Sequence, residues 1–167
     1  MTKTDENLKI AFAGESQANR KYLAFAKKAE EEGFLNLAKM FRAIAEAETV
    51  HAMNHLKALK MIKTTEENLK ASLEGETYEF TKMYPEFIDT SNKEGVKDAS
   101  LSFSYANQVE KIHGKLYEKA MSLIENNKDI EEKEFFVCPV CGNTFEGNAP
   151  NRCPICSTPK EKFKKIL

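Results

Sequence analysis

Four glutamates lie at the centres of four apolar helical faces, and this feature limits the possible folds more than any other in the chain. Residues 1–126 are rich in Ala, Leu, Lys and Glu, contain one proline and show the apolar spacing of amphipathic helices. The expected helices span about 4–32, 34–62, 66–94 and 96–126. On a helical wheel their apolar faces are centred on Glu15, Glu48, Glu76 and Glu110. The pattern predicts an all-α four-helix bundle with carboxylates inside it.

Carboxylates inside a bundle need a compensating positive charge. An unpaired buried carboxylate costs several kcal/mol or takes up a proton at a raised pKa. No Lys or Arg occupies the four apolar faces. Cations are therefore the expected partners of these glutamates, and more than one cation is needed.

The spacing around the glutamates indicates which cations these are. Glu48 and Glu110 each begin a Glu-x-x-His motif, which ends at His51 and His113, and Glu76 begins a Glu-x-x-Glu motif, which ends at Glu79. Residues three apart on a helix lie on one side, so both side chains of a motif reach one site. With Glu15, this is the di-iron carboxylate pattern of ferritin-like bundles, with one carboxylate extra. Carboxylates with a few imidazoles suit iron or manganese.

A second metal motif occupies the C-terminal end. The four cysteines form two Cys-Pro-x-Cys pairs, Cys138 with Cys141 and Cys153 with Cys156, after a polar linker at 126–134. Four thiolates at this spacing hold one tetrahedral ion, and so short a segment needs the ion to fold. The site accepts iron or zinc, and only iron carries an electron.

Together these motifs predict two domains. We expect a di-iron four-helix bundle over residues 1–130 and a small, β-rich, metal-stapled four-cysteine domain over 131–167. The chain has 25 Lys+Arg and 26 Asp+Glu, so no basic excess favours nucleic acid or a membrane surface as partner. No apolar run is long enough to cross a bilayer and no apolar leader is visible, so a cytoplasmic protein is expected.

The chain resembles the rubrerythrin family over essentially its whole length. The matching motifs are Phe12-Ala13-Gly14-Glu15-Ser16, the segment from Glu48 to His51, Gly75-Glu76-Thr77-Tyr78-Glu79 with Met83-Tyr84-Pro85, the segment from Glu110 to His113, and both Cys pairs. The resemblance implies a ferritin-like bundle followed by a rubredoxin-like Fe(Cys)4 domain. It also implies that Glu48 and Glu110 bridge two irons, that Glu15 holds one iron, and that Glu76 and His113 hold the other.

The resemblance assigns the two remaining residues as alternatives. Glu79 would bind the iron held by Glu15 when that iron is ferric, and His51 would bind the same iron when it is ferrous. The family reduces hydrogen peroxide to water with electrons from reduced pyridine nucleotide, delivered by a partner such as rubredoxin or its reductase. The main alternative is a ferroxidase or iron-handling protein that uses oxygen. A zinc ribbon fused to a structural bundle would leave the inward-facing carboxylates unexplained.

Two features leave questions open. Ser157 follows the second Cys pair where rubredoxin-like domains usually have Gly, as Gly142 follows the first, and a left-handed Ser costs about 1 kcal/mol. Glu48 follows Glu15 by 33 positions and Glu110 follows Glu76 by 34, so the bundle consists of two similar hairpins. The link between them is either stretched, a tight turn, or exchanged between two protomers. A homodimer is expected in each case. One reason is that a Cys centre on a short linker can lie far from its own chain's irons.

Overall fold

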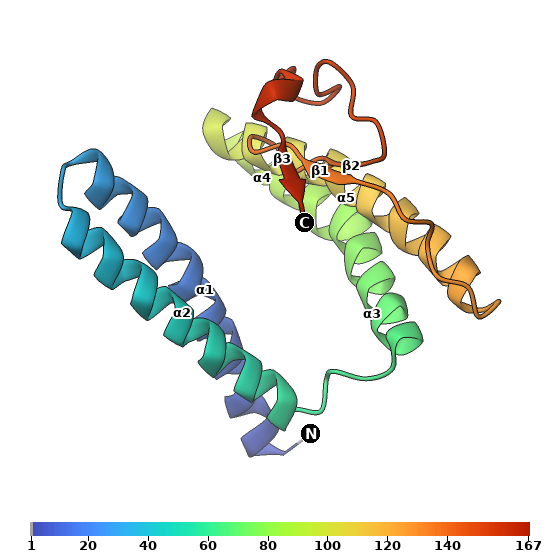
Figure 1. Cartoon of the computed structure of the whole chain (residues 1–167), viewed down its shortest axis with the longest axis horizontal. Helices are drawn as coiled ribbons and strands as arrows, with labels where there is room; N and C mark the ends of the chain where they lie inside the picture. The colour runs from blue at the N-terminus through green and yellow to red at the C-terminus, as the bar shows by residue number, and fades with distance from the viewer. Residues whose placement is uncertain (1) are drawn as a thin grey trace. The chain divides into compact units, whose positions relative to one another are not determined.

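The structure is a computed structural model that describes residues 2–167. It consists of two compact units, one ending at Lys63 and the other beginning at Thr64 (Figure 1). Both are mainly helical, and a small antiparallel sheet lies near the C-terminus. This composition confirms the predicted fold class. The domain boundary expected at 130 and 131 falls inside the second unit and stays a prediction.

The first unit is an antiparallel helical hairpin of α1 (Lys3–Glu31) and α2 (Leu35–Ala58). Small residues form its buried seam and allow the helices to approach closely, namely Ala26, Ala29, Ala38, Ala45 and Ala52. Asn19 is also buried, and its amide donates hydrogen bonds to the Ala45 carbonyl oxygen at 2.7 Å and the Thr49 hydroxyl at 2.9 Å. These hydrogen bonds fix the position of α1 along the axis of α2.

The end of α2 differs from the expectation. The apolar pattern predicts a helix to about residue 62, but α2 ends at Ala58. Lys60 takes a left-handed conformation with φ of 53°, which a continuing helix cannot accommodate. The connection to the second unit therefore starts four residues earlier than the periodicity suggests.

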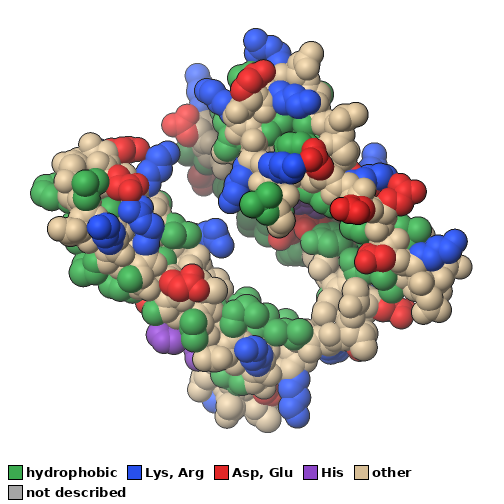
Figure 2. Space-filling model, viewed as in Figure 1, with side chains coloured by type: hydrophobic (Ala, Val, Ile, Leu, Met, Phe, Trp, Pro, Cys, Tyr) green, Lys and Arg blue, Asp and Glu red, His purple; other side chains and the backbone are tan. Residues whose placement is uncertain are grey.

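The first unit also exposes large apolar side chains. Ile10 is 69% exposed, Val50 52% and Met40 50%, and Figure 2 shows hydrophobic side chains on the surface of this hairpin. An amphipathic helix normally buries such a stripe. The hairpin alone therefore leaves apolar surface uncovered.

The second unit begins with a hairpin whose first arm is interrupted. The arm consists of α3 (Thr65–Tyr78), a π-helical turn η1 (Glu79–Met83) and α4 (Tyr84–Glu94), and it packs against α5 (Lys97–Ile124). One continuous helix over 66–94 was expected. A π turn takes up an extra residue, and the turn lies within the hairpin whose glutamates are 34 rather than 33 positions apart. The arm from Glu76 to the end of α4 is thus longer than the arm from Glu15 to the end of α1, and the loop that follows it is one residue shorter.

The Cys-rich segment, residues 135–167, forms a three-stranded antiparallel sheet. Its strands are β1 (Phe135–Val137), β2 (Thr144–Glu146) and β3 (Lys164–Ile166), in the order β2-β1-β3, with a 3-10 turn η2 (Lys160–Lys162) before β3. The rings of Phe145 and Phe163 stack with centroids 4.9 Å apart. Strand β2 contacts α5, so the sheet packs on the second hairpin.

Across residues 2–167, no helix combines the length and the apolar character that crossing a bilayer requires.

Candidate metal centres

The first unit brings three of the predicted ligands together. Glu15 on α1 and Glu48 and His51 on α2 each offer one donor atom, and these atoms lie within 4.8 Å of one another. His51 Nδ1 lies 2.8 Å from Glu48 Oε2, as the three-residue spacing on one helix predicts. The Glu48 side chain is 15% exposed and that of His51 54% exposed.

The second unit repeats this arrangement. Glu76 on α3 joins Glu110 and His113 on α5, again with donor atoms within 4.8 Å. His113 Nδ1 lies 2.7 Å from Glu110 Oε2 and 3.9 Å from Glu76 Oε2. Each unit thus supplies two carboxylates and one imidazole, a donor set that suits iron or manganese.

The surroundings of the carboxylates in the second unit disfavour their ionised form. Burial, the hydrogen bond with Glu110 and the charge of Glu110 raise the pKa of Glu76 to about 7, although His113 acts in the opposite direction. Burial also raises the pKa of Glu110. A cation placed among these oxygens would reverse both shifts, because it favours the ionised form. The electrostatics therefore fit a metal site.

Glu79 holds a different position from the other six predicted ligands. It lies on η1 and, among the described residues, belongs to neither set of three. Burial and the charge of Glu76 raise its pKa, and His113 lowers it, so it does interact with the second set. Its role as a ligand stays a prediction.

The second ring nitrogen of His113 contacts the Cys-rich segment. His113 Nε2 lies 3.0 Å from the hydroxyl oxygen of Thr144, the first residue of β2. When Nδ1 binds a metal, Nε2 keeps its proton and donates to this hydroxyl, which fixes the orientation of the ring. Thr144 follows Cys141 by only three positions. The Cys-rich segment therefore contacts a predicted ligand of its own chain.

The four cysteines form one cluster. Cys138, Cys141, Cys153 and Cys156 are free thiols, and one Sγ from each lies within 4.8 Å of the others. Burial opposes ionisation of Cys138, but hydrogen bonds, first those from the backbone of Cys141 and Val140, lower its pKa to about 6. Burial raises the pKa of Cys141. Four sulfurs at this separation fit a single tetrahedral ion.

The two Cys pairs have the same backbone geometry. The N–H of Gly142 donates to the Cys138 carbonyl oxygen at 3.0 Å, and the N–H of Ser157 donates to that of Cys153 at 2.9 Å. Both residues are left-handed, with φ of 82° for Gly142 and 61° for Ser157. The sequence prediction of a strained serine at the second pair is confirmed.

Two buried polar residues near the sulfurs were not identified from the sequence. Asn143 Nδ2 lies 3.8 Å from Cys153 Sγ, and Thr158 Oγ1 lies 3.1 Å from Cys156 Sγ. Each follows the second cysteine of its pair by two positions, and this repeated offset was the available signal. Hydrogen bonds to the sulfurs of an Fe(Cys)4 site tune its reduction potential.

Both halves of the chain are similar to known proteins. The family model for rubrerythrin matches residues 6–121, and the model for the rubrerythrin rubredoxin-like domain matches residues 136–164. Rubrerythrin-2 of Clostridium acetobutylicum is 35% identical over 175 residues, covering 96% of this chain and 95% of its own. Nigerythrin of Nitratidesulfovibrio vulgaris is 36% identical over 174 residues, covering 96% and 85%. A structure of fully reduced, all-ferrous nigerythrin has a TM-score of 0.59 at 34% identity, covering 99% of this chain and 88% of that chain.

Proposed function

The chain belongs to the rubrerythrin family, and from this premise we propose that it is a peroxidase that reduces hydrogen peroxide to water. Its relatives are oxidoreductases with a di-iron site. In this chain the four cysteines serve one iron and the Glu/His cluster serves the di-iron site, as in nigerythrin. The observation that carries the proposal is that the Cys-rich segment, which would store an electron, contacts His113 of the peroxide-reducing centre.

The two sets of three residues would combine to hold the two irons. The proposed ligands are Glu15, Glu48, His51, Glu76, Glu79, Glu110 and His113. When bound, the irons supply the two electrons that reduce peroxide. The role of the chain is to place hard carboxylate oxygens and borderline imidazoles around both metals, so that both oxidation states find suitable donors. Glu79 stands outside both sets. It is proposed to bind iron in the ferric state, with His51 as the alternative ligand in the ferrous state.

Electrons would return through the four-cysteine centre. The Thr144 hydroxyl joins the two regions, because it bonds to His113 and lies three positions after Cys141. The proposed donor is rubredoxin or its reductase, with reduced pyridine nucleotide as the original source. We also propose a cytoplasmic location, since a reducing compartment keeps the four thiols free to bind metal.

The link between the hairpins favours a homodimer with exchanged hairpins. Only residues 59–64 connect α2 to α3, and six extended residues span at most about 21 Å. The 24-residue helix α2 is about 36 Å long. A crossover along the whole bundle, as in ferritin-like folds, does not fit this link. The same arrangement forms when the second hairpin comes from another copy of the chain.

Anaerobic stopped flow on the fully reduced, iron-loaded protein tests the proposed activity. The absorbance of both iron centres is followed after mixing with hydrogen peroxide and, separately, with oxygen. We expect peroxide to oxidise both centres much faster than oxygen does. Equal rates would instead favour the ferroxidase, and a four-cysteine site without any colour change would contain zinc and carry no electrons.

A further inference from the structure

The second unit contains a cavity beside the predicted metal ligands Glu76 and His113. Its volume is about 480 Å³, and it lies among α3, α5, the linker and the Cys-rich sheet. Ligand-binding pockets typically measure about 300–1,000 Å³. The other residues that line it are mainly apolar, chiefly Leu69, Leu116, Tyr117, Ala120, Ile130 and Phe135. Hydrogen peroxide is small and polar, so it needs neither this volume nor this lining.

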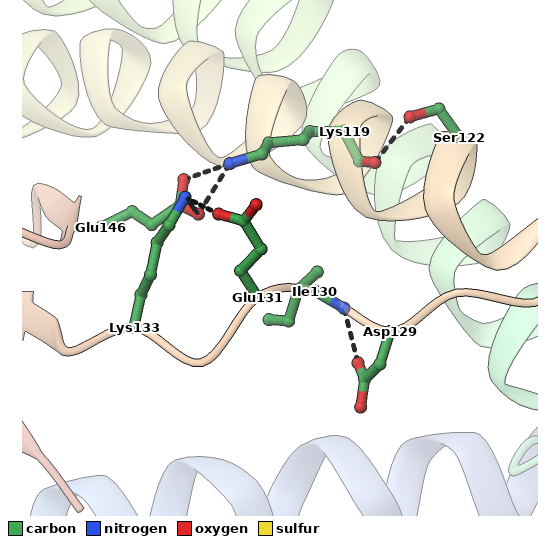
Figure 3. A network of polar contacts seen from close by, with 7 residues as sticks. All are labelled: Lys119, Ser122, Asp129, Ile130, Glu131, Lys133 and Glu146. Carbon is green, nitrogen blue, oxygen red and sulfur yellow. Dashed lines mark hydrogen bonds and ion pairs between the residues drawn. The ribbon is translucent and has the colours of Figure 1, made fainter.

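Among the described residues, the one lysine that lines the cavity, Lys119, is paired with Glu146 of the same lining. Lys119 Nζ lies 2.6 Å from Glu146 Oε1, Lys133 Nζ lies 3.2 Å from the same oxygen, and Lys133 also pairs with Glu131 at 3.0 Å. Figure 3 shows Lys119 of α5 and Lys133 of the linker converging on Glu146. Lys133 and Glu131 join this pair from outside the lining, and the network of two lysines and two glutamates has no net charge. This rim therefore offers no unpaired cation to attract an anionic ligand such as a nucleotide.

We propose that this cavity binds the organic group of alkyl hydroperoxides and that the same centre reduces them. Such molecules are neutral at pH 7, with an apolar group that suits the lining and a peroxide end that suits the polar side at Glu76 and His113. The O–O bond breaks as ROOH takes up two electrons and two protons and gives ROH and water. The inference rests on the proposed function, because the electrons come from the same reduced iron centres.

Two variants change the cavity by different physical means. Ala120→Phe fills part of its volume from α5, and Ile130→Glu places a charge beside the apolar lining from a residue that is 39% exposed. Each has a matched control outside the cavity. Ser122→Phe adds the same ring at an exposed position two residues further along α5, and Leu167→Glu adds the same charge at the exposed C-terminal residue.

The experiment measures binding and turnover on the full-length, iron-loaded protein. Calorimetry follows the binding of 2-phenyl-2-propanol, the unreactive alcohol product of cumene hydroperoxide. Steady-state assays compare cumene hydroperoxide and tert-butyl hydroperoxide with hydrogen peroxide. In both cavity variants we expect the affinity for the alcohol to fall at least tenfold. We expect the same fall in the ratio of kcat/KM for cumene hydroperoxide to kcat/KM for hydrogen peroxide. Both quantities should keep their wild-type values in the controls.

The outcomes separate this inference from the proposed function. Turnover of hydrogen peroxide without turnover of either organic hydroperoxide would overturn the inference and leave the proposed function standing. Alcohol binding that the cavity variants do not weaken would also overturn it. If hydrogen peroxide itself were not reduced, the proposed function would fail, and the calorimetry would still decide whether the cavity binds the organic group.

Discussion

Ser157 stands in a backbone conformation that favours glycine. Its φ is 61°, and its counterpart Gly142 has φ of 82° with the same N–H hydrogen bond to the first cysteine of its pair. A side chain in this region costs about 1 kcal/mol. We predict that Ser157→Gly raises the free energy of unfolding of the iron-loaded Cys-rich segment by up to about 1 kcal/mol. Thermal unfolding, monitored through the iron–sulfur absorbance, measures the change. Ser157→Ala serves as the control, and equal stabilities of the two variants would contradict the strain argument.

Glu76 should make the stability of the metal-free protein depend on pH. Its pKa is raised from 4.5 to about 7, first by burial and then by Glu110, so the folded chain binds a proton that the unfolded chain has lost. This contribution to stability is complete below pH 4.5 and disappears as the pH rises to about 7. We predict that urea midpoints of the metal-free protein fall across this interval, and that Glu76→Gln reduces the fall. A midpoint that rises through the interval would contradict the assignment.

Iron binding should show the complementary dependence. A metal ligand must lose its proton, so iron competes with the proton on Glu76. Apparent iron affinity should therefore increase as the pH rises toward about 7. The pH dependence of iron content after equilibration with limiting Fe(II) measures this effect.

At the level of elements, the sequence predicted the helices from their periodicity but not the interruption of one of them. The difference between 33 and 34 positions was visible, yet periodicity cannot locate one extra residue within a helix. The structure places a π turn at Glu79–Met83, within the longer of the two spacings. The ligand motifs were found because three-residue spacing is local, and six of the seven predicted ligands gather accordingly. Glu79, the first residue of this π turn, belongs to neither set among the described residues.

The contact between β2 and α5 could not be predicted, because it joins residues 31 positions apart across two motifs that were read separately. We predict that Thr144→Val lowers peroxide turnover about tenfold, since loss of a hydrogen-bond partner to a ligating histidine typically costs about 10–100-fold. Stopped flow should show slower oxidation of the cysteine-bound iron after peroxide is added. Thr144→Ser keeps the hydroxyl and should restore the rate. If Val and Ser behaved alike, Thr144 would not position His113.

At the scale of the whole molecule, the sequence predicted two similar hairpins and a short link. It could not decide among the three possible connections, because helix ends are uncertain by a few residues. The structure narrows the link to residues 59–64 and shows that each hairpin carries one complete set of three ligands. A site that needs two sets can therefore take one from each of two chains.

Complementation between two inactive variants tests this exchange. One chain carries Glu15→Ala and Glu48→Ala, which removes two of the three ligands of the first hairpin, and the other carries Glu110→Ala and His113→Ala, which removes two of the three ligands of the second. Each homodimer lacks a complete site, whether each site forms within one chain or from hairpins exchanged between two chains. With exchanged hairpins, a mixed dimer has one site with both sets intact, so we predict about half the wild-type iron content and peroxidase activity. The mixed dimer is isolated by co-expression with two different affinity tags. If it were as inactive as its parents, both sets of each site would come from a single chain, and the six-residue link would have to act as a tight turn.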